Sequence, residues 1–77
     1  MRYRAHVILN YDPRLNRKIG SYFGFEAFDD SDAKNRAKNY IKEMDERGKK
    51  EKDIIDRYSV QLLKLTRVNA LDEEFET

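Results

Sequence analysis

Residues 2–11 alternate between two kinds of side chain, and this alternation restricts the fold more than any other feature of the sequence. The odd positions hold Tyr3, Ala5, Val7, Leu9 and Tyr11, and the even positions hold Arg2, Arg4, His6, Ile8 and Asn10. A period of two predicts a β-strand that buries one of its faces. We expect this long and regular strand to be the central strand of a sheet.

The segment that follows predicts a turn and a second strand. Pro13 fixes its own φ and lacks a donor for a sheet ladder, so the first strand ends before it. A second alternation, from Lys18 to Ala27, then completes a predicted β-hairpin. Gly20 and Gly24 weaken this second strand, which indicates a bulge, an edge position or the close approach of another surface.

Helical spacing follows the hairpin. Ala33, Ala37, Tyr40, Ile41 and Met44 form one stripe of an α-helix. Asp30 or Ser31 can cap the first free N–H groups of this helix. Gly48 is placed to end it as a C′ glycine. We therefore expect a single amphipathic helix after the hairpin.

A third strand is predicted from about Tyr58 to Val68, but its phase changes along its length. Tyr58, Val60 and Leu62 alternate with polar residues, whereas Leu63 is adjacent to Leu62, and Leu65 follows in the opposite phase. Either a bulge shifts the register or both faces of the strand are covered. Residues 53–58 fit a helical turn, a loop or a strand.

These elements predict an α+β fold in the chain order ββαβ. The sheet has three antiparallel strands in the order 2-1-3, and the helix packs on one face. The second strand, with its two glycines, is then an edge strand. One domain spans residues 1–68, and we predict that residues 69–77 form a flexible acidic tail.

The predicted tail has two further interpretations. Leu71 and Phe75 lie among four acidic residues and no basic one. They could form an amphipathic turn that docks to a basic groove, or the tail could fold back on the protein's own cations. Deleting the tail would lower the affinity for a partner only in the first case.

Several function classes are excluded by residues that the sequence lacks. The 77 residues include no cysteine, and His6 is the single histidine, without a motif that would place a nucleophile beside it. The acids at positions 29–32 lack the spacing of a calcium loop, because Ile41 stands where the glutamate is needed. We therefore predict no enzymatic activity, no catalytic residue, no metal, no cofactor and no small-molecule substrate.

The sequence also predicts a cytoplasmic protein without a membrane partner. No stretch of about 18 apolar residues is present. The first residues lead directly into the first strand and do not have the shape of a signal peptide.

Two surfaces are candidates for binding. One helix covers only one face of three strands, so the other face meets water or a partner. The residues predicted to bind a partner on this open face are Arg4, His6, Ile8, Tyr22, Leu63 and Leu65. The two leucines belong to it only if the third strand keeps its later phase, and otherwise lie beneath the helix. The second candidate is the basic tip of the hairpin, Arg14, Leu15, Arg17 and Lys18, which could bind protein acids or phosphate.

The charge distribution keeps nucleic-acid binding open as an alternative. The net charge is +1, but residues 1–68 hold 16 basic and 11 acidic side chains, a net +5. Arg2, Arg4, His6, Tyr22 and the basic tip could contact bases and phosphates. The aromatic residues do not have the spacing of an RNA-recognition domain, and acids interrupt the basic residues of the helix.

The stretch from Phe25 to Ala37, FEAFDDSDAKNRA, resembles the strand-to-helix junction of very small ββαβ proteins encoded by phages and other mobile elements. The resemblance implies a binding-only modulator of a host protein machine, as in anti-CRISPR and other anti-defence proteins, acting by occlusion in the host cytoplasm. We therefore expect a non-enzymatic protein-binding module that uses the open face or an edge strand. A homodimer is a variant of this hypothesis, because an exposed edge invites self-pairing.

Overall fold

The computed structural model of the chain describes residues 1–11, 17–53 and 55–77. The elements follow in the order β1 (Arg2–Tyr11), β2 (Lys18–Glu26), α1 (Asp30–Lys49), β3 (Tyr58–Val68) and β4 (Glu74–Glu76). One antiparallel sheet of order β2-β1-β3-β4 contains all four strands. The α+β class and the 2-1-3 order are thus confirmed, and β4 is an addition to the three predicted strands.

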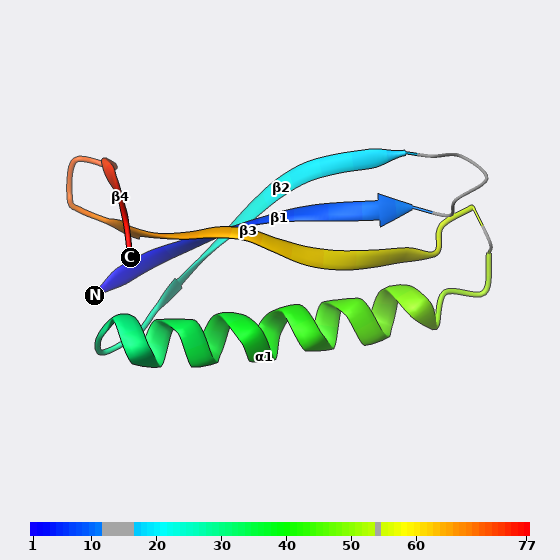
Figure 1. Cartoon of the computed structure of the whole chain (residues 1–77), viewed down its shortest axis with the longest axis horizontal. Helices are drawn as coiled ribbons and strands as arrows, with labels where there is room; N and C mark the ends of the chain where they lie inside the picture. The colour runs from blue at the N-terminus through cyan, green and yellow to red at the C-terminus, as the bar shows by residue number, and fades with distance from the viewer. Residues whose placement is uncertain (12–16, 54) are drawn as a thin grey trace.

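The molecule is elongated, with extents of 40 × 20 × 15 Å. In Figure 1, α1 runs alongside β3, while β2 lies on the opposite side of the central strand β1. The helix therefore covers the β1–β3 half of one sheet face, and β2 is the outermost strand on the other side. No helix in the described part of the chain is long and apolar enough to cross a membrane.

The helix begins one residue earlier than the sequence predicts. Asp29 is the N-cap, and its carboxylate accepts a hydrogen bond of 2.7 Å from the Asp32 backbone N–H. The Asp32 carboxylate in turn accepts from the Phe28 N–H at 3.0 Å and from Arg36 at 2.9 Å. The bond to Asp29 satisfies an N–H group that a helix start leaves free, and the bonds from the Phe28 N–H and from Arg36 lower the pKa of Asp32.

Gly48 lies inside α1 and does not act as a C′ glycine. The helix continues to Lys49, and none of the described glycines has a positive φ. A Cβ atom at Gly48 would overlap the carbonyl oxygen and the ring of Tyr58, where β3 begins. The glycine is needed because the end of the helix and the start of β3 touch.

A β-bulge accounts for the change of phase in β3. Ala5 and His6 of β1 pair with Leu65 and Lys64, whereas the next residue, Val7, pairs with Leu62. Leu63 is therefore the extra residue of the bulge, and its side chain is exposed. Without the bulge, strict alternation would place the residues before or after it on the wrong face.

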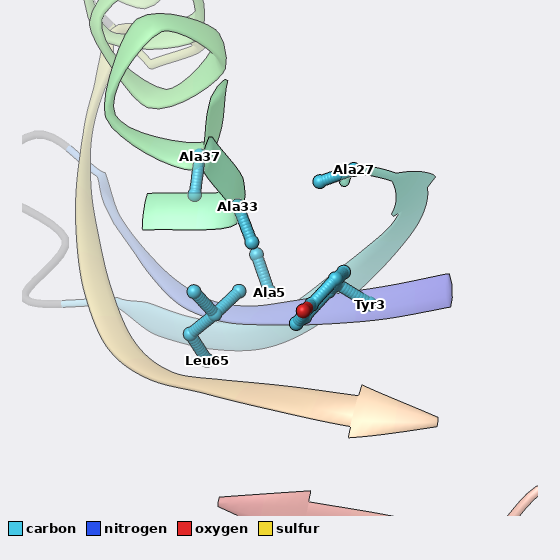
Figure 2. Close-up of a cluster of buried hydrophobic side chains, with 6 residues drawn as sticks. All are labelled: Tyr3, Ala5, Ala27, Ala33, Ala37 and Leu65. Carbon is cyan, nitrogen blue, oxygen red and sulfur yellow. The ribbon is translucent and has the colours of Figure 1, made fainter. Parts of the chain in front are cut away.

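The core between α1 and the sheet consists mainly of small side chains. The buried cluster comprises Tyr3, Ala5, Ala27, Ala33, Ala37 and Leu65. Figure 2 shows Ala33 and Ala37 of the helix directed at Ala5 and Leu65 of the sheet. Alanines at this contact allow the helix backbone to approach the sheet closely. Leu65 thus belongs to the core, which corrects its predicted place on the open face: the bulge turns it towards the helix.

Tyr3 links the core to the start of the helix. Its hydroxyl donates a hydrogen bond of 2.7 Å to the Asp30 carboxylate. Burial, together with this bond to an anion, raises the pKa of Tyr3 to about 12. The ring also stacks on Phe25 of β2, with a centroid distance of 6.0 Å.

Residues 69–77, which we call the C-terminal arm, contain β4 and so differ from the flexible tail that the sequence predicts. Thr66, Arg67 and Val68 of β3 pair with Glu76, Phe75 and Glu74, respectively. A turn joins the two strands, in which the Asn69 side chain accepts from the backbone N–H groups of Leu71 and Glu73, each at 2.9 Å. The short segment is ordered because its backbone pairs with β3 and because the Asn69 side chain holds the turn between the two strands.

Candidate interaction surfaces

The C-terminal arm lies against the basic part of the open face. Arg4 donates hydrogen bonds to Glu74 at 2.6 Å and to Asp72 at 2.9 Å. Its guanidinium carbon also lies 4.9 Å from the centre of the Tyr22 ring. Arg4 is therefore held between an aromatic ring and two carboxylates of the protein's own chain.

His6 joins the same cluster. Its Nε2 lies 3.1 Å and 3.2 Å from the two carboxylate oxygens of Glu74. Because an ionised carboxylate only accepts, Nε2 must carry the hydrogen of this bond. The imidazole also packs against the Tyr22 ring, with a centroid distance of 5.8 Å. The open-face cluster thus consists of Arg4, His6, Tyr22, Asp72 and Glu74.

Charge pairing within the cluster determines its ionisation. The hydrogen bonds from Arg4 and His6 lower the pKa of Glu74, and the bond to Glu74 raises the pKa of Arg4. The carboxylate and guanidinium therefore stay ionised near neutral pH. This arrangement corresponds to the predicted alternative in which the tail folds back on the protein's own cations.

The predicted partner-binding residues do not form one surface. Arg4, His6 and Tyr22 lie together on the open face, and Ile8 lies next to them on β1, half-buried. Leu63 lies at the bulge, in a shallow groove of about 450 Å³ that Leu62 and the α1 residues Lys34 and Lys38 also line. With Leu65 in the core, only one of the two leucines remains available to a partner.

The basic tip is described only in part. Arg14 and Leu15 lie outside the described residues. Arg17 places its guanidinium carbon 5.6 Å from the centre of the Tyr11 ring, and Lys18 is the first residue of β2. Both described residues are exposed.

The outer edge of β2 is a further surface. No described strand pairs with this edge, because β2 ends the sheet and its only neighbour is β1. On the helix side of β2, Phe23 and Phe25 are half-buried and meet the edge of the Tyr40 ring at centroid distances of 5.8 Å each. Tyr40 is itself 40% exposed. The helix therefore leaves the aromatic side of β2 incompletely covered.

The sequence predicts the edge position of β2 and carries its signal in Gly20 and Gly24, but it does not assign a binding role to this edge residue by residue. A Cβ atom at Gly20 would meet nothing within 4 Å, and one at Gly24 would meet only the Tyr3 carbonyl oxygen at 3.7 Å. Neither glycine is needed for packing against the residues that the structure describes. Of the three interpretations that the sequence allows for them, the structure confirms the edge position and shows no bulge in β2.

Among the described residues, no group of three or more histidine, aspartate or glutamate side chains is arranged to hold a metal ion. Comparisons with protein-family models, with curated proteins and with solved structures find no match for this chain. The function is therefore inferred from the geometry of the surfaces.

Proposed function

We propose that this protein is a non-enzymatic protein-binding module that adds an extended strand of a protein partner to the outer edge of β2. One observation carries the proposal: β2 is a nine-residue strand whose outer edge is paired by no strand in the described part of the chain. A free edge presents a row of unpaired N–H and C=O groups that template the pairing of another chain.

β2 lacks the features that commonly protect an edge strand from pairing. Its pairing with β1 is continuous from Glu26 to Lys18, so no bulge twists the edge away. It contains no proline, and its charged residues, Lys18 and Glu26, stand only at its two ends. Natural edge strands are usually short, bulged or charged along their length. The edge of β2 is long and uncharged over its central seven residues, 19–25.

Nucleic-acid binding remains the alternative function, and the open-face cluster makes it the weaker one. Arg4 and His6 already bind the acidic side chains of the C-terminal arm. A nucleic acid would have to displace these acids, and their charge would repel its phosphates. Retention of DNA or RNA that falls with salt, and that is lost when Arg14 and Arg17 are reversed in charge, would support the alternative.

A matched pair of substitutions at Gly20 tests the proposed function. The Gly20 N–H points to the outer edge because the odd residues of β2 are the ones that bond to β1, so Gly20→Pro removes an edge donor and leaves the pairing with β1 intact. Gly20→Ala keeps the donor, and its methyl group enters open space. Each variant and the unmodified protein would be tagged and purified with bound proteins from the cells that produce it, and the partners identified by mass spectrometry.

We expect a partner that is retained by the unmodified protein and by Gly20→Ala but is lost with Gly20→Pro. Circular dichroism of the three proteins checks that the fold is unchanged. A partner that binds Gly20→Pro as strongly as Gly20→Ala would contradict strand addition at β2. Loss of that partner on Tyr22→Ala would then move the binding site to the open face.

A further inference from the structure

The backbone groups that β2 presents to its outer edge can be assigned from the hairpin. Met1 and Ala27 exchange two hydrogen bonds, of 2.9 Å and 3.0 Å, and at the other end the Tyr11 N–H donates to the Arg17 carbonyl oxygen at 2.9 Å. Bonded and non-bonded pairs alternate along an antiparallel ladder. The odd residues of β2 therefore bond to β1, and the even residues direct their N–H and C=O groups outwards: Lys18, Gly20, Tyr22, Gly24 and Glu26.

We propose that the strand added at this edge is β2 of a second copy of the chain, in an antiparallel pairing centred on Tyr22. The inference rests on the proposed function and names the partner for the same edge. A twofold axis at Tyr22 pairs it with Tyr22 of the second copy, Gly20 with Gly24, and Lys18 with Glu26. Each outward N–H and C=O then faces an outward group of the other copy, as an isologous interface requires.

Charge complementarity supports this register. Lys18 and Glu26 are the only charged residues of β2, and they lie at its two ends. Antiparallel pairing about Tyr22 places each lysine opposite a glutamate, so two pairs of opposite charge form. Opposite charges on facing residues stabilise strand pairing, and like charges destabilise it. A register shifted by two residues would lose both pairs.

The open face of the paired strands explains the glycines. In this register Gly20 and Gly24 of opposite copies flank the two central tyrosines. Tyr22 is 62% exposed, and a Cβ at Gly20 would enter open space. Small residues beside the tyrosines leave room for two aromatic rings to meet across the twofold axis.

The helix side of β2 gains a cover from the same pairing. Ile19 would face Phe25 of the second copy, and Ser21 would face Phe23. These are non-hydrogen-bonded pairs, in which facing side chains approach most closely. Ile19, Phe23 and Phe25 are half-buried in the single chain, because α1 packs against β3 and reaches β2 mainly through Tyr40. The second copy supplies apolar contacts that the helix does not.

Charge reversal at the two ends of β2 tests the dimer and its register together. Sedimentation velocity over a range of concentrations should show a species of twice the 9.2 kDa chain mass. Lys18→Glu and Glu26→Lys each create two like-charge contacts in their own dimers, and we expect each to weaken dimerisation by about tenfold or more. An equimolar mixture of the two variants restores both opposite-charge pairs, so the mixed dimer should form at least as readily as the unmodified one.

A chain that stays monomeric at its highest soluble concentration would overturn the dimer. Single variants that dimerise normally, or a mixture that does not recover, would overturn the register. Thermal unfolding of each variant controls for stability, because Glu26 also faces Arg2 within the hairpin. The dimer can fail without the proposed function: a monomeric protein that still loses a different partner on Gly20→Pro would contradict this inference but support strand addition at β2.

Discussion

The two edges of the sheet are satisfied in different ways. At the β3 edge, groups of the same chain bind the backbone: the Asp45 carboxylate of α1 accepts from the Val60 N–H at 2.9 Å, and the Thr77 N–H and hydroxyl donate to the Leu65 carbonyl oxygen at 3.3 Å and 3.2 Å. A bulge at Leu63 and the short strand β4 interrupt what remains of that edge. The β2 edge has none of these features in the described residues.

The difference shows which part of the sheet is available to another chain. Backbone groups at a sheet edge must bind to protein or water. At β3 the helix and the C-terminal arm provide the partners, whereas at β2 none of the described segments does, which leaves solvent or a second molecule. Predictions that weaken the β3 edge should therefore lower stability, whereas those at the β2 edge should change association.

The largest effect is expected where the β3 edge meets the core. Leu65→Ala removes the largest aliphatic side chain of the buried cluster and should lower the free energy of unfolding by about 3 kcal/mol. Leu63→Ala is the matched control, because Leu63 is 57% exposed, and it should cost less than about 0.5 kcal/mol. Urea denaturation measures both. Equal losses would mean that the bulge does not separate the two leucines as described.

A smaller loss is expected at the start of β3. Gly48→Ala inserts a methyl group where the Tyr58 carbonyl and ring already lie, so α1 and β3 must separate. We expect a destabilisation of about 2 kcal/mol, even though alanine is the better helix former. Gly20→Ala, measured in the same denaturation series, should cost almost nothing. A stabilised Gly48→Ala variant would show that helix propensity outweighs the contact.

Removing the hydrogen bond between α1 and the β3 edge should have a still smaller effect. Asp45→Ala leaves the Val60 N–H without its acceptor and deletes the ion pair with Lys49. Because the carboxylate is partly exposed, we expect a loss of about 1 kcal/mol. Lys49→Ala separates the contribution of the ion pair from that of the hydrogen bond. It removes only the ion pair and should lower the free energy of unfolding by less. Amide exchange at Val60 should accelerate in Asp45→Ala but not in Lys49→Ala.

Acid should release the C-terminal arm and make the β3 edge resemble the β2 edge. The pKa of Glu74 in the folded protein lies below its ordinary value of 4.5. Its contribution to stability is therefore complete above pH 4.5 and is lost as the pH falls through the lower, folded pKa. The Thr77 amide, which bonds to Leu65, should change its NMR chemical shift over that acidic range.

Glu74→Gln is the control for this titration. It abolishes the ionisable group that Arg4 and His6 bind, so the Thr77 shift should lie partly towards its released position already at neutral pH and respond less to acid. A full acid transition in Glu74→Gln would assign the release to other carboxylates. Asp32 and Asp45, whose pKa values are also lowered, would be the first to examine.

The smallest effect on stability is expected at the β2 edge. Gly20→Thr replaces a glycine in a strand with a β-branched residue, and the side chain enters open space. We expect a gain of up to about 1 kcal/mol in the unfolding free energy of the monomer. A loss of stability would mean that Gly20 already contacts another part of the chain.

Much of the fold follows from local patterns. Alternation over residues 2–11 predicts β1 with its observed bounds, and the alanine stripe predicts α1. The leucine pair at 62–63 indicates the bulge as one of two readings, and the tertiary structure selects it. These features are predictable because hydrogen-bonding geometry imposes a period of two or of 3.6 on any buried face.

Features that depend on long-range contact were not predictable in the same way. Gly48 has the sequence position of a C′ glycine, yet a glycine is needed there because Tyr58, ten residues along the chain, leaves no space for a Cβ atom. The order of the arm depends on its pairing with β3 and also on Glu74, which contacts Arg4 and His6 about seventy residues away. Its charge of −4 against the +5 of the preceding residues was the available signal, but charge alone does not specify which residues pair.

The sequence by itself determined three of the four strands, the helix and a sheet with one uncovered face, because periodicity and turn residues act over short distances. Only the tertiary structure decided which edge of the sheet is left without a partner among the described residues. The arm and the end of the helix satisfy the β3 edge, and β2 remains open because no described segment reaches it. Edge satisfaction depends on which distant groups the fold brings together, and this is why it required the three-dimensional arrangement.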